Sequence, residues 1–95
     1  MSTDNYFRGG SSLKPRPGEV QTDPTTGLLR PTRGASVFNR PDNLDRFGGA
    51  YRVTQLPVEL RIIRRGPDPS HFEIVPARPM TLQQVEEALG KIVLI

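Results

Sequence analysis

Closely spaced proline and glycine residues limit what this chain can fold into more than any other feature. The 95 residues include 10 prolines and 9 glycines, which favour short strands and turns over long helices. In the second half of the chain, Phe, Ile, Val and Leu alternate with polar residues, as in strands with one buried face. A chain of this length forms one domain with a small core. The sequence therefore predicts a single α+β domain over residues 1–95, with strongly bent, mainly antiparallel β-sheets and one or two short helices.

Several segments carry the strand pattern, and each is bounded by residues that favour turns. These segments are residues 5–8, 33–38, 50–55, 59–65 and 71–75. A short turn joins the last two, so we expect them to be antiparallel neighbours. Proline and glycine within residues 23–27 predict a turn, and hence a hairpin between residues 19–22 and 28–30.

Two helices are expected. The first is short, is capped by Asn39 or Asp42 and runs to about Phe47. The second begins after Thr81, because Thr81 and Gln84 have the spacing of a capping box. Its buried stripe is predicted from apolar residues at helical spacing, namely Leu82, Val85, Leu89 and Ile92. Residues 92–95 are apolar enough to pack on the sheet or to add a closing strand.

The segment with residues 71–75 holds the only histidine of the chain. Alternation places His71 and Glu73 on one face of a strand and Phe72 and Ile74 on the other, which suits a core. Any reaction that depends on histidine must therefore use His71. The alternative is a structural histidine beside an exposed strand glutamate, and the pattern alone leaves both interpretations open.

The charge is basic, and arginine supplies most of it. The net charge is +3, and lysine occurs only at Lys14 and Lys91. Arginine presents a rigid fork of donors that suits phosphate and carboxylate groups. This composition is consistent with a phosphate-bearing ligand, a nucleic acid, an acidic protein partner or simply a solvated arginine surface.

The residues that the chain lacks exclude several classes of protein. Cysteine is absent, which excludes disulfides and thiolate zinc sites. A single histidine argues against a transition-metal site, and no metal ligand is assigned. The first residues lack the basic and apolar regions of a signal peptide, and no apolar run is long enough to cross a membrane. We expect a chain made in the cytoplasm that would leave the cell without a cleaved signal peptide.

Three segments resemble small bacterial toxins with the ADP-ribosyltransferase type of fold, which occur as type VI secretion effectors and as tips of polymorphic toxins. The first is Tyr-Phe-Arg-Gly-Gly at residues 6–10. The second, residues 34–40, is similar to that family's Gly-Thr-Ser-Val-Phe segment, with Ala35 in place of the threonine. The third is residues 71–80, which begin with His71. The order and spacing match from about Gly34 to the helix after Thr81.

The resemblance implies a cleft between small sheets that holds NAD as a substrate. In this superfamily an arginine or histidine on the first strand, a serine on the second and a later glutamate contact the cofactor. Carried over to this chain, these roles fall to Arg8, Ser36 and His71. The chain has no Glu-x-Glu pair before its last strand, so a histidine stands where most of the superfamily relies on glutamate.

Further site residues follow from the chemistry of NAD. Departure of nicotinamide leaves positive charge on the ribose, so the site must orient the substrate and complement that charge. Backbone at Gly9 would approach the ligand closely, and Phe38 or Tyr51 would offer a face for the nicotinamide ring. Glu73 is a second candidate for stabilising the charge. The arginines proposed to contact the pyrophosphate or a target are Arg33, Arg64 and Arg65.

The resemblance thus predicts an antibacterial toxin, acting in the cytoplasm of a target cell, with a cognate immunity protein that we expect to be acidic. Two other functions fit the residues. An RNA-targeting toxin would grip phosphates with arginine and use His71 as an acid or base. A non-catalytic module would bind an acidic partner through its arginines.

Overall fold

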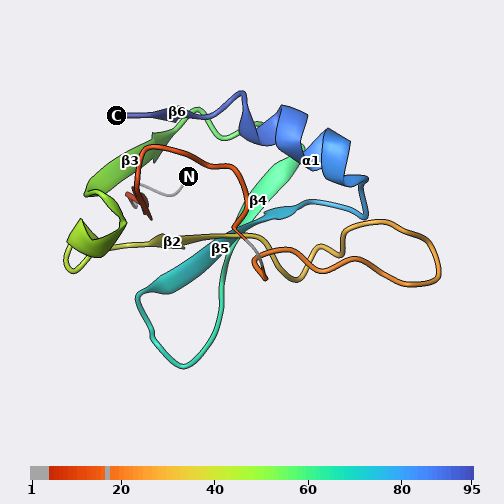
Figure 1. The fold of residues 1–95 in the computed structure, drawn as a ribbon, viewed down its shortest axis with the longest axis horizontal. Coiled ribbons are helices and arrows are strands. Elements are labelled where there is room, and N and C mark those ends of the chain that lie inside the picture. The colour runs from red at the N-terminus through yellow and green to blue at the C-terminus, as the bar shows by residue number, and fades with distance from the viewer. Residues whose placement is uncertain (1–4, 17) are drawn as a thin grey trace.

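The sheet organises this domain. The computed structural model describes residues 5–16 and 18–95, and it has one antiparallel sheet with the strand order β4-β5-β2-β1-β3-β6 (Figure 1). The strands are β1 (Phe7–Gly9), β2 (Ala35–Phe38), β3 (Ala50–Thr54), β4 (Leu60–Arg64), β5 (His71–Pro76) and β6 (Val93–Leu94). The helices are the 3-10 turn η1 (Asp45–Phe47) and α1 (Leu82–Leu89). A small α+β domain with a mainly antiparallel sheet is therefore confirmed.

Register on the central strands separates a polar face from an apolar one. On β2 and β5, Ser36 pairs with Glu73 and Phe38 with His71. The intervening pairs are Val37 with Phe72 and Ala35 with Ile74. Since side chains alternate along a strand, these intervening pairs face the core, and the predicted division of residues 71–74 between two faces is confirmed.

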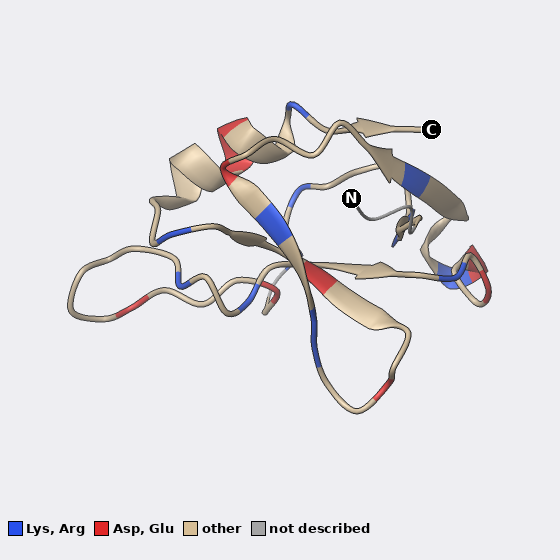
Figure 2. Cartoon of the chain, turned by 180° about the vertical axis from the view of Figure 1, so that it is seen from behind, with Lys and Arg blue, Asp and Glu red and all other residues tan. Residues whose placement is uncertain are grey.

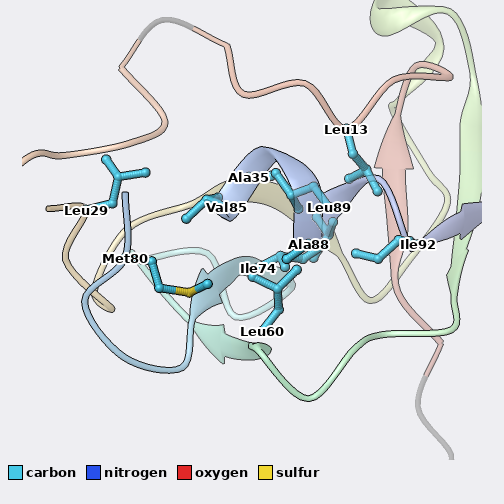
Figure 3. Close-up of a cluster of buried hydrophobic side chains, with 11 residues drawn as sticks. Leu13, Leu29, Ala35, Leu60, Ile74, Met80, Val85, Ala88, Leu89 and Ile92 are labelled. Carbon is cyan, nitrogen blue, oxygen red and sulfur yellow. The ribbon is translucent and has the colours of Figure 1, made fainter. Parts of the chain in front are cut away.

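Helix α1 covers the apolar face of the sheet, and the core lies between them (Figures 1 and 3). The core side chains come from the loops, the strands and the helix alike. They are Leu13, Leu29, Ala35, Val37, Leu60, Ile74, Met80, Val85, Ala88, Leu89 and Ile92. Leu13, in the loop after β1, therefore belongs to the same core cluster as the buried side chains of α1.

The predicted capping box starts α1. Thr81 Oγ1 accepts a hydrogen bond from the Gln84 backbone N at 3.1 Å, and Gln84 Oε1 accepts one from the Thr81 backbone N at 2.9 Å. The predicted stripe is wrong at its first member, because Leu82 is 47% exposed. Ala88 takes part in the buried stripe instead, together with Val85 and Leu89.

The first predicted helix shrinks to a single 3-10 turn. Asn43 has a φ of 65°, a left-handed conformation that a helix running on from Asp42 cannot contain. The turn starts after Leu44, which makes no side-chain cap, and Gly48 ends it with a φ of 100°. The predicted caps at Asn39 and Asp42 are therefore wrong.

Two further predictions concern the chain's connections. Asp23 organises the turn at residues 23–27, and its Oδ1 accepts a hydrogen bond from the Thr25 backbone N at 2.8 Å. The expected hairpin strands reduce to one bridge, between Thr22 and Leu29, and Leu29 also bridges Met80. The closing strand is confirmed as β6, which pairs with β3.

We expect Leu89→Ala to lower the free energy of unfolding by about 2–4 kcal/mol, since it empties part of a packed core. Leu82→Ala is the matched control on the same helix, and its exposure predicts a loss of less than about 1 kcal/mol. Urea unfolding followed by circular dichroism measures both. Equal losses in the two variants would contradict this placement of the helix.

Candidate functional site

The structure brings two of the predicted site residues into direct contact. His71 lies diagonally across from Ser36, because Ser36 pairs with Glu73 and Phe38 with His71 in the ladder between β2 and β5. The Ser36 Oγ and the His71 Nε2 are 3.1 Å apart, within hydrogen-bond distance. Both side chains are half-buried, so rigid strands hold a hydroxyl against an imidazole at the polar face of the sheet.

The turn before β5 fixes the orientation of the imidazole. His71 Nδ1 lies 2.8 Å from the backbone oxygen of Arg65, and a carbonyl oxygen only accepts, so Nδ1 carries a proton. In the neutral ring Nε2 is then the acceptor for the Ser36 hydroxyl. Backbone bonds between Arg65 and His71 and between His71 and Asp68 close the turn around the ring. The pair therefore has the geometry of a hydroxyl with an adjacent base.

A cavity begins beside this pair. The Phe38 ring lies 5.2 Å from the His71 ring, tilted by 56°, and it also lines a cavity of about 630 Å³. This volume lies in the range of small-molecule sites, roughly 300–1,000 Å³. The lining combines an aromatic ring with polar and charged side chains, and it consists of Phe38, Arg40, Asp42, Asn43, Leu44, Asp45, Arg46, Asp68 and Ser70.

Glu73 is on the same face as His71 but has another role in the fold. Its side chain is buried, and its Oε1 accepts a hydrogen bond from the backbone N of Gly34 at 3.0 Å. Arg33 Nε lies 3.5 Å from the same oxygen. A Cβ at Gly34 would come within 1.8 Å of the Ile74 backbone oxygen. Glu73 thus ties the start of β2 to β5 where only glycine fits.

Arg8 lies on the other side of the sheet from the Ser36 hydroxyl. Phe7 pairs with Phe38, so alternation directs Tyr6 and Arg8 to the apolar face. The edge contact of Tyr6 with Phe72, with ring centroids 5.0 Å apart, agrees with this direction. Arg8 is completely buried. Its side chain meets the backbone of Ser36 but not the Ser36 hydroxyl.

Arg8 and Glu19 form a buried ion pair in a split between β1 and β2. The two strands pair only at Phe7 and Phe38. Beyond that point Arg8 donates to Glu19 Oε2 at 2.8 Å and Oε1 at 3.1 Å. Ser36 is bonded to both, since its backbone N donates to Glu19 at 2.8 Å and its backbone O accepts from Arg8 at 2.9 Å. The ion pair replaces the missing ladder bonds.

The surroundings of Glu19 favour its ionised form. Burial alone would raise the pKa of this carboxyl, but hydrogen bonds from the Arg8 guanidinium and from the backbone N–H groups of Arg16 and Ser36 lower its pKa to about 2. Glu19 is therefore a carboxylate at any physiological pH. Its carboxylate is surrounded by hydrogen-bond donors, and one of them is the buried Arg8 guanidinium.

Gly9 and Tyr51 lie away from the contact of Ser36 with His71. A Cβ at Gly9 would come within 2.5 Å of the Phe47 ring, so the close approach predicted for a ligand is made here by an aromatic side chain. Arg16 donates to the Gly9 backbone oxygen and its guanidinium stacks over the same ring. Tyr51 is the register partner of Arg8 on β3, which places it on the opposite face from Phe38.

The arginines do not gather at this site. Figure 2 shows basic residues on β3 and β4 at different ends of the sheet and in the connecting loops. Arg33 contacts Glu73 and the Gly18 backbone, and Arg64 donates to the Gly66 backbone oxygen at 2.8 Å. Arg65 contributes its backbone to His71. The contacts that the structure gives for Arg33, Arg64 and Arg65 are with other residues of the chain and not with the Ser36 and His71 side chains.

Sequence reasoning missed Glu19. One signal was available, because Glu19 is the only acidic residue between Asp4 and Asp23. An arginine buried near the start of the chain needs a carboxylate partner, and Glu19 is the first acidic residue that follows Arg8. The proline-rich stretch around Glu19 has no strand or helix pattern, so hydrophobic periodicity could not predict that Glu19 lies beside β2.

Comparison with protein-family models, with curated protein sequences and with solved structures found no match to this chain. Within residues 5–16 and 18–95, no three His, Asp or Glu side chains are grouped as ligands for a metal ion. In the same part of the chain, no helix combines the length and apolar character needed to cross a bilayer.

We expect Glu19 to make stability depend on pH below 4.5. Its pKa is lowered from 4.5 to about 2 by folding, so its contribution is fully present above pH 4.5 and is lost as the pH falls through about 2. The loss is on the order of 2–3 kcal/mol. Urea unfolding between pH 5 and 2 measures it.

The matched comparison uses Glu19→Gln, which should be less stable at pH 6 and should lose less stability on acidification. Glu87→Gln, at an exposed position of α1, should follow the unsubstituted chain. A pH dependence in Glu19→Gln as steep as that of the unsubstituted chain would show that another carboxyl is responsible.

Proposed function

We propose that this chain is an antibacterial toxin of the ADP-ribosyltransferase type, which uses NAD in the cytoplasm of a target cell. The observation that carries the proposal is the contact between Ser36 and His71 at 3.1 Å. These residues come from two of the three segments that resemble the family. Ser36 and His71 are 35 residues apart in the sequence, yet they meet at one point beside a cavity.

The proposed binding site lies on the polar face of β2 and β5, beside the cavity. Ser36 presents its hydroxyl to His71 on this face. Phe38 follows on the same face and leads into the cavity. This arrangement supports binding of the ribose at Ser36 and His71, with the nicotinamide ring near Phe38.

The reaction breaks the bond between C1′ of the ribose and the nicotinamide nitrogen. The bonding electron pair leaves with nicotinamide, which becomes neutral, and the ribose takes up the positive charge. Water or a target side chain then forms a bond to C1′ and loses a proton. Ser36 orients the ribose. His71 Nε2, whose lone pair faces the Ser36 hydroxyl in the neutral ring, is placed to accept a proton.

An acidic immunity protein is the partner that we propose for this toxin. β4 is an edge strand, and its Arg61 and Arg64 are exposed. These two arginines extend from opposite faces of the strand, and their positive charge along the edge attracts an acidic partner. Such a protein would block the toxin by covering the cavity or the split. Delivery by type VI secretion is part of the same proposal and rests on the family resemblance.

We expect cytoplasmic expression of the chain to arrest growth of a bacterial host and the purified chain to release nicotinamide from NAD. Ser36→Ala and His71→Ala should each reduce the release by about 100-fold or more and restore growth. Chromatography of the NAD reaction measures nicotinamide directly. Ser11→Ala, at an exposed serine, is the matched control and should keep full activity.

The same preparation incubated with total RNA separates this proposal from an RNA-targeting toxin. Cleaved RNA with intact NAD would reject NAD chemistry. Retention of full toxicity by both Ser36→Ala and His71→Ala, with both variants folded, would reject the site.

A further inference from the structure

We infer that the free edge of β4 binds an extended, acidic segment of a partner protein, which adds a strand to the sheet beside β4. The position, the backbone pattern and the charge of β4 carry this inference. Only the identification of that partner as the immunity protein rests on the proposed function.

β4 is the edge of the sheet that can accept another strand. It pairs with β5 over all 5 of its residues in one unbroken register, and among the described residues no strand lies on its other side. β6, at the opposite edge, has only 2 residues, and very short edge strands resist further pairing. A longer, regular edge strand such as β4 presents a row of free backbone donors and acceptors.

The hydrogen bonds at the ends of β4 show which of its backbone groups are free. Glu59 accepts a backbone bond from the residue after β5 at 2.8 Å, and Arg65 donates one to the first residue of β5 at 3.1 Å. Because the pairs that exchange bonds alternate along an antiparallel ladder, the odd-numbered residues of β4 bond to β5. The backbone N–H and C=O groups of Ile62 and Arg64 therefore point away from β5, toward the free side.

Two arginines give this edge its charge. Arg61 and Arg64 are exposed, and they extend from opposite faces of the strand. Arg61 makes no hydrogen bond or ion pair within the described part of the chain. Arg64 donates to the Gly66 backbone oxygen at 2.8 Å, which holds its guanidinium near the end of the strand. The two cations therefore flank the free backbone groups.

This arrangement defines the sequence of the partner strand. The residue directly opposite an arginine lies on the same face and pairs with it. Two acidic residues with two residues between them would meet Arg61 and Arg64, whichever way the added strand runs. The residues between them would lie opposite Ile62 and Ile63, which are half-buried and suit apolar neighbours. We therefore expect the pattern acidic, apolar, apolar, acidic.

The charge of β4 also disfavours a second copy of this chain as the occupant. Pairing of two β4 strands would bring the arginines of both copies together, and like charges on neighbouring strands are destabilising. An acidic strand is instead attracted. Val58, in the turn before β4, is 93% exposed, and it offers apolar surface to a partner that extends past the start of the strand.

The test adds the peptide acetyl-Thr-Thr-Glu-Val-Val-Glu-Thr-Thr-amide, at millimolar concentration and pH 7, to the full chain and follows amide hydrogen exchange by NMR. In the free chain the amides of Arg61 and Ile63 should exchange slowly and those of Ile62 and Arg64 quickly. Near saturation, the peptide should slow exchange at Ile62 and Arg64 by about 10-fold. Unchanged exchange at these two amides would overturn the inference.

A peptide of the same composition, acetyl-Thr-Thr-Glu-Val-Glu-Val-Thr-Thr-amide, is the control for spacing. Its glutamates share one face of a strand, so they cannot meet Arg61 and Arg64 together, and it should bind at least about 3-fold more weakly. Equal binding of the two peptides would overturn the predicted pairing.

Arg61→Glu should weaken binding of the first peptide by about 5-fold or more, because it replaces an attraction across the strands by a repulsion. Arg52→Glu, at an exposed position of β3, is the matched control and should bind as the unsubstituted chain does. Equal losses in the two variants would mean a general charge effect and would overturn the inference. Binding of a short oligouridylate as tight as that of the peptide would also overturn it, in favour of a nucleic acid.

These readouts need no enzymatic activity. Protection of Ile62 and Arg64 by the peptide, in a chain that releases no nicotinamide from NAD, would support the edge site and reject the proposed function. Release of nicotinamide with no protection of these amides would reject the edge site alone.

Discussion

The buried ion pair of Arg8 and Glu19 is the interaction on which the sheet depends. It bridges the place where β1 and β2 stop pairing, and it satisfies the backbone N and O of Ser36 that would otherwise face a gap. A charge as deeply buried as Arg8 is tolerated only with such a partner. The loop that contains Glu19 therefore contributes hydrogen bonds that hold β1 and β2 together.

Ser36 joins this ion pair to the site that we propose. Its backbone is bonded to Arg8 and Glu19, whereas its hydroxyl meets His71 on the other strand. A change in the split would therefore move the same residue that we propose to orient a ribose. Ser36 alone connects the ion pair with His71, because its backbone bonds to Glu19 and its hydroxyl contacts the imidazole. No longer chain of contacts through the core is needed.

Local patterns in the sequence predicted much of the fold. The alternation of residues 71–74, the capping box of Thr81 and the pairing of β4 with β5 are short-range features, and the structure has all of them. The role of Glu19 could not be predicted from local patterns, because Glu19 lies in an aperiodic loop, 11 residues from its partner Arg8. The direction of Arg8 was likewise hidden. Its strand is too short to show a period, so the face that it takes depends on pairing across the sheet.

Gly34 suggests how loss of function will be distributed in this protein. No room exists for a side chain there, because a Cβ would come within 1.8 Å of the Ile74 backbone oxygen. The Gly34 N–H donates a hydrogen bond to Glu73. Any larger residue would push β2 away from β5 and part the two strands that carry Ser36 and His71. A genetic screen for survivors of the proposed toxin should therefore recover changes at Gly34, although this residue has no reactive side chain. Such changes would inactivate the protein by increasing the distance between β2 and β5.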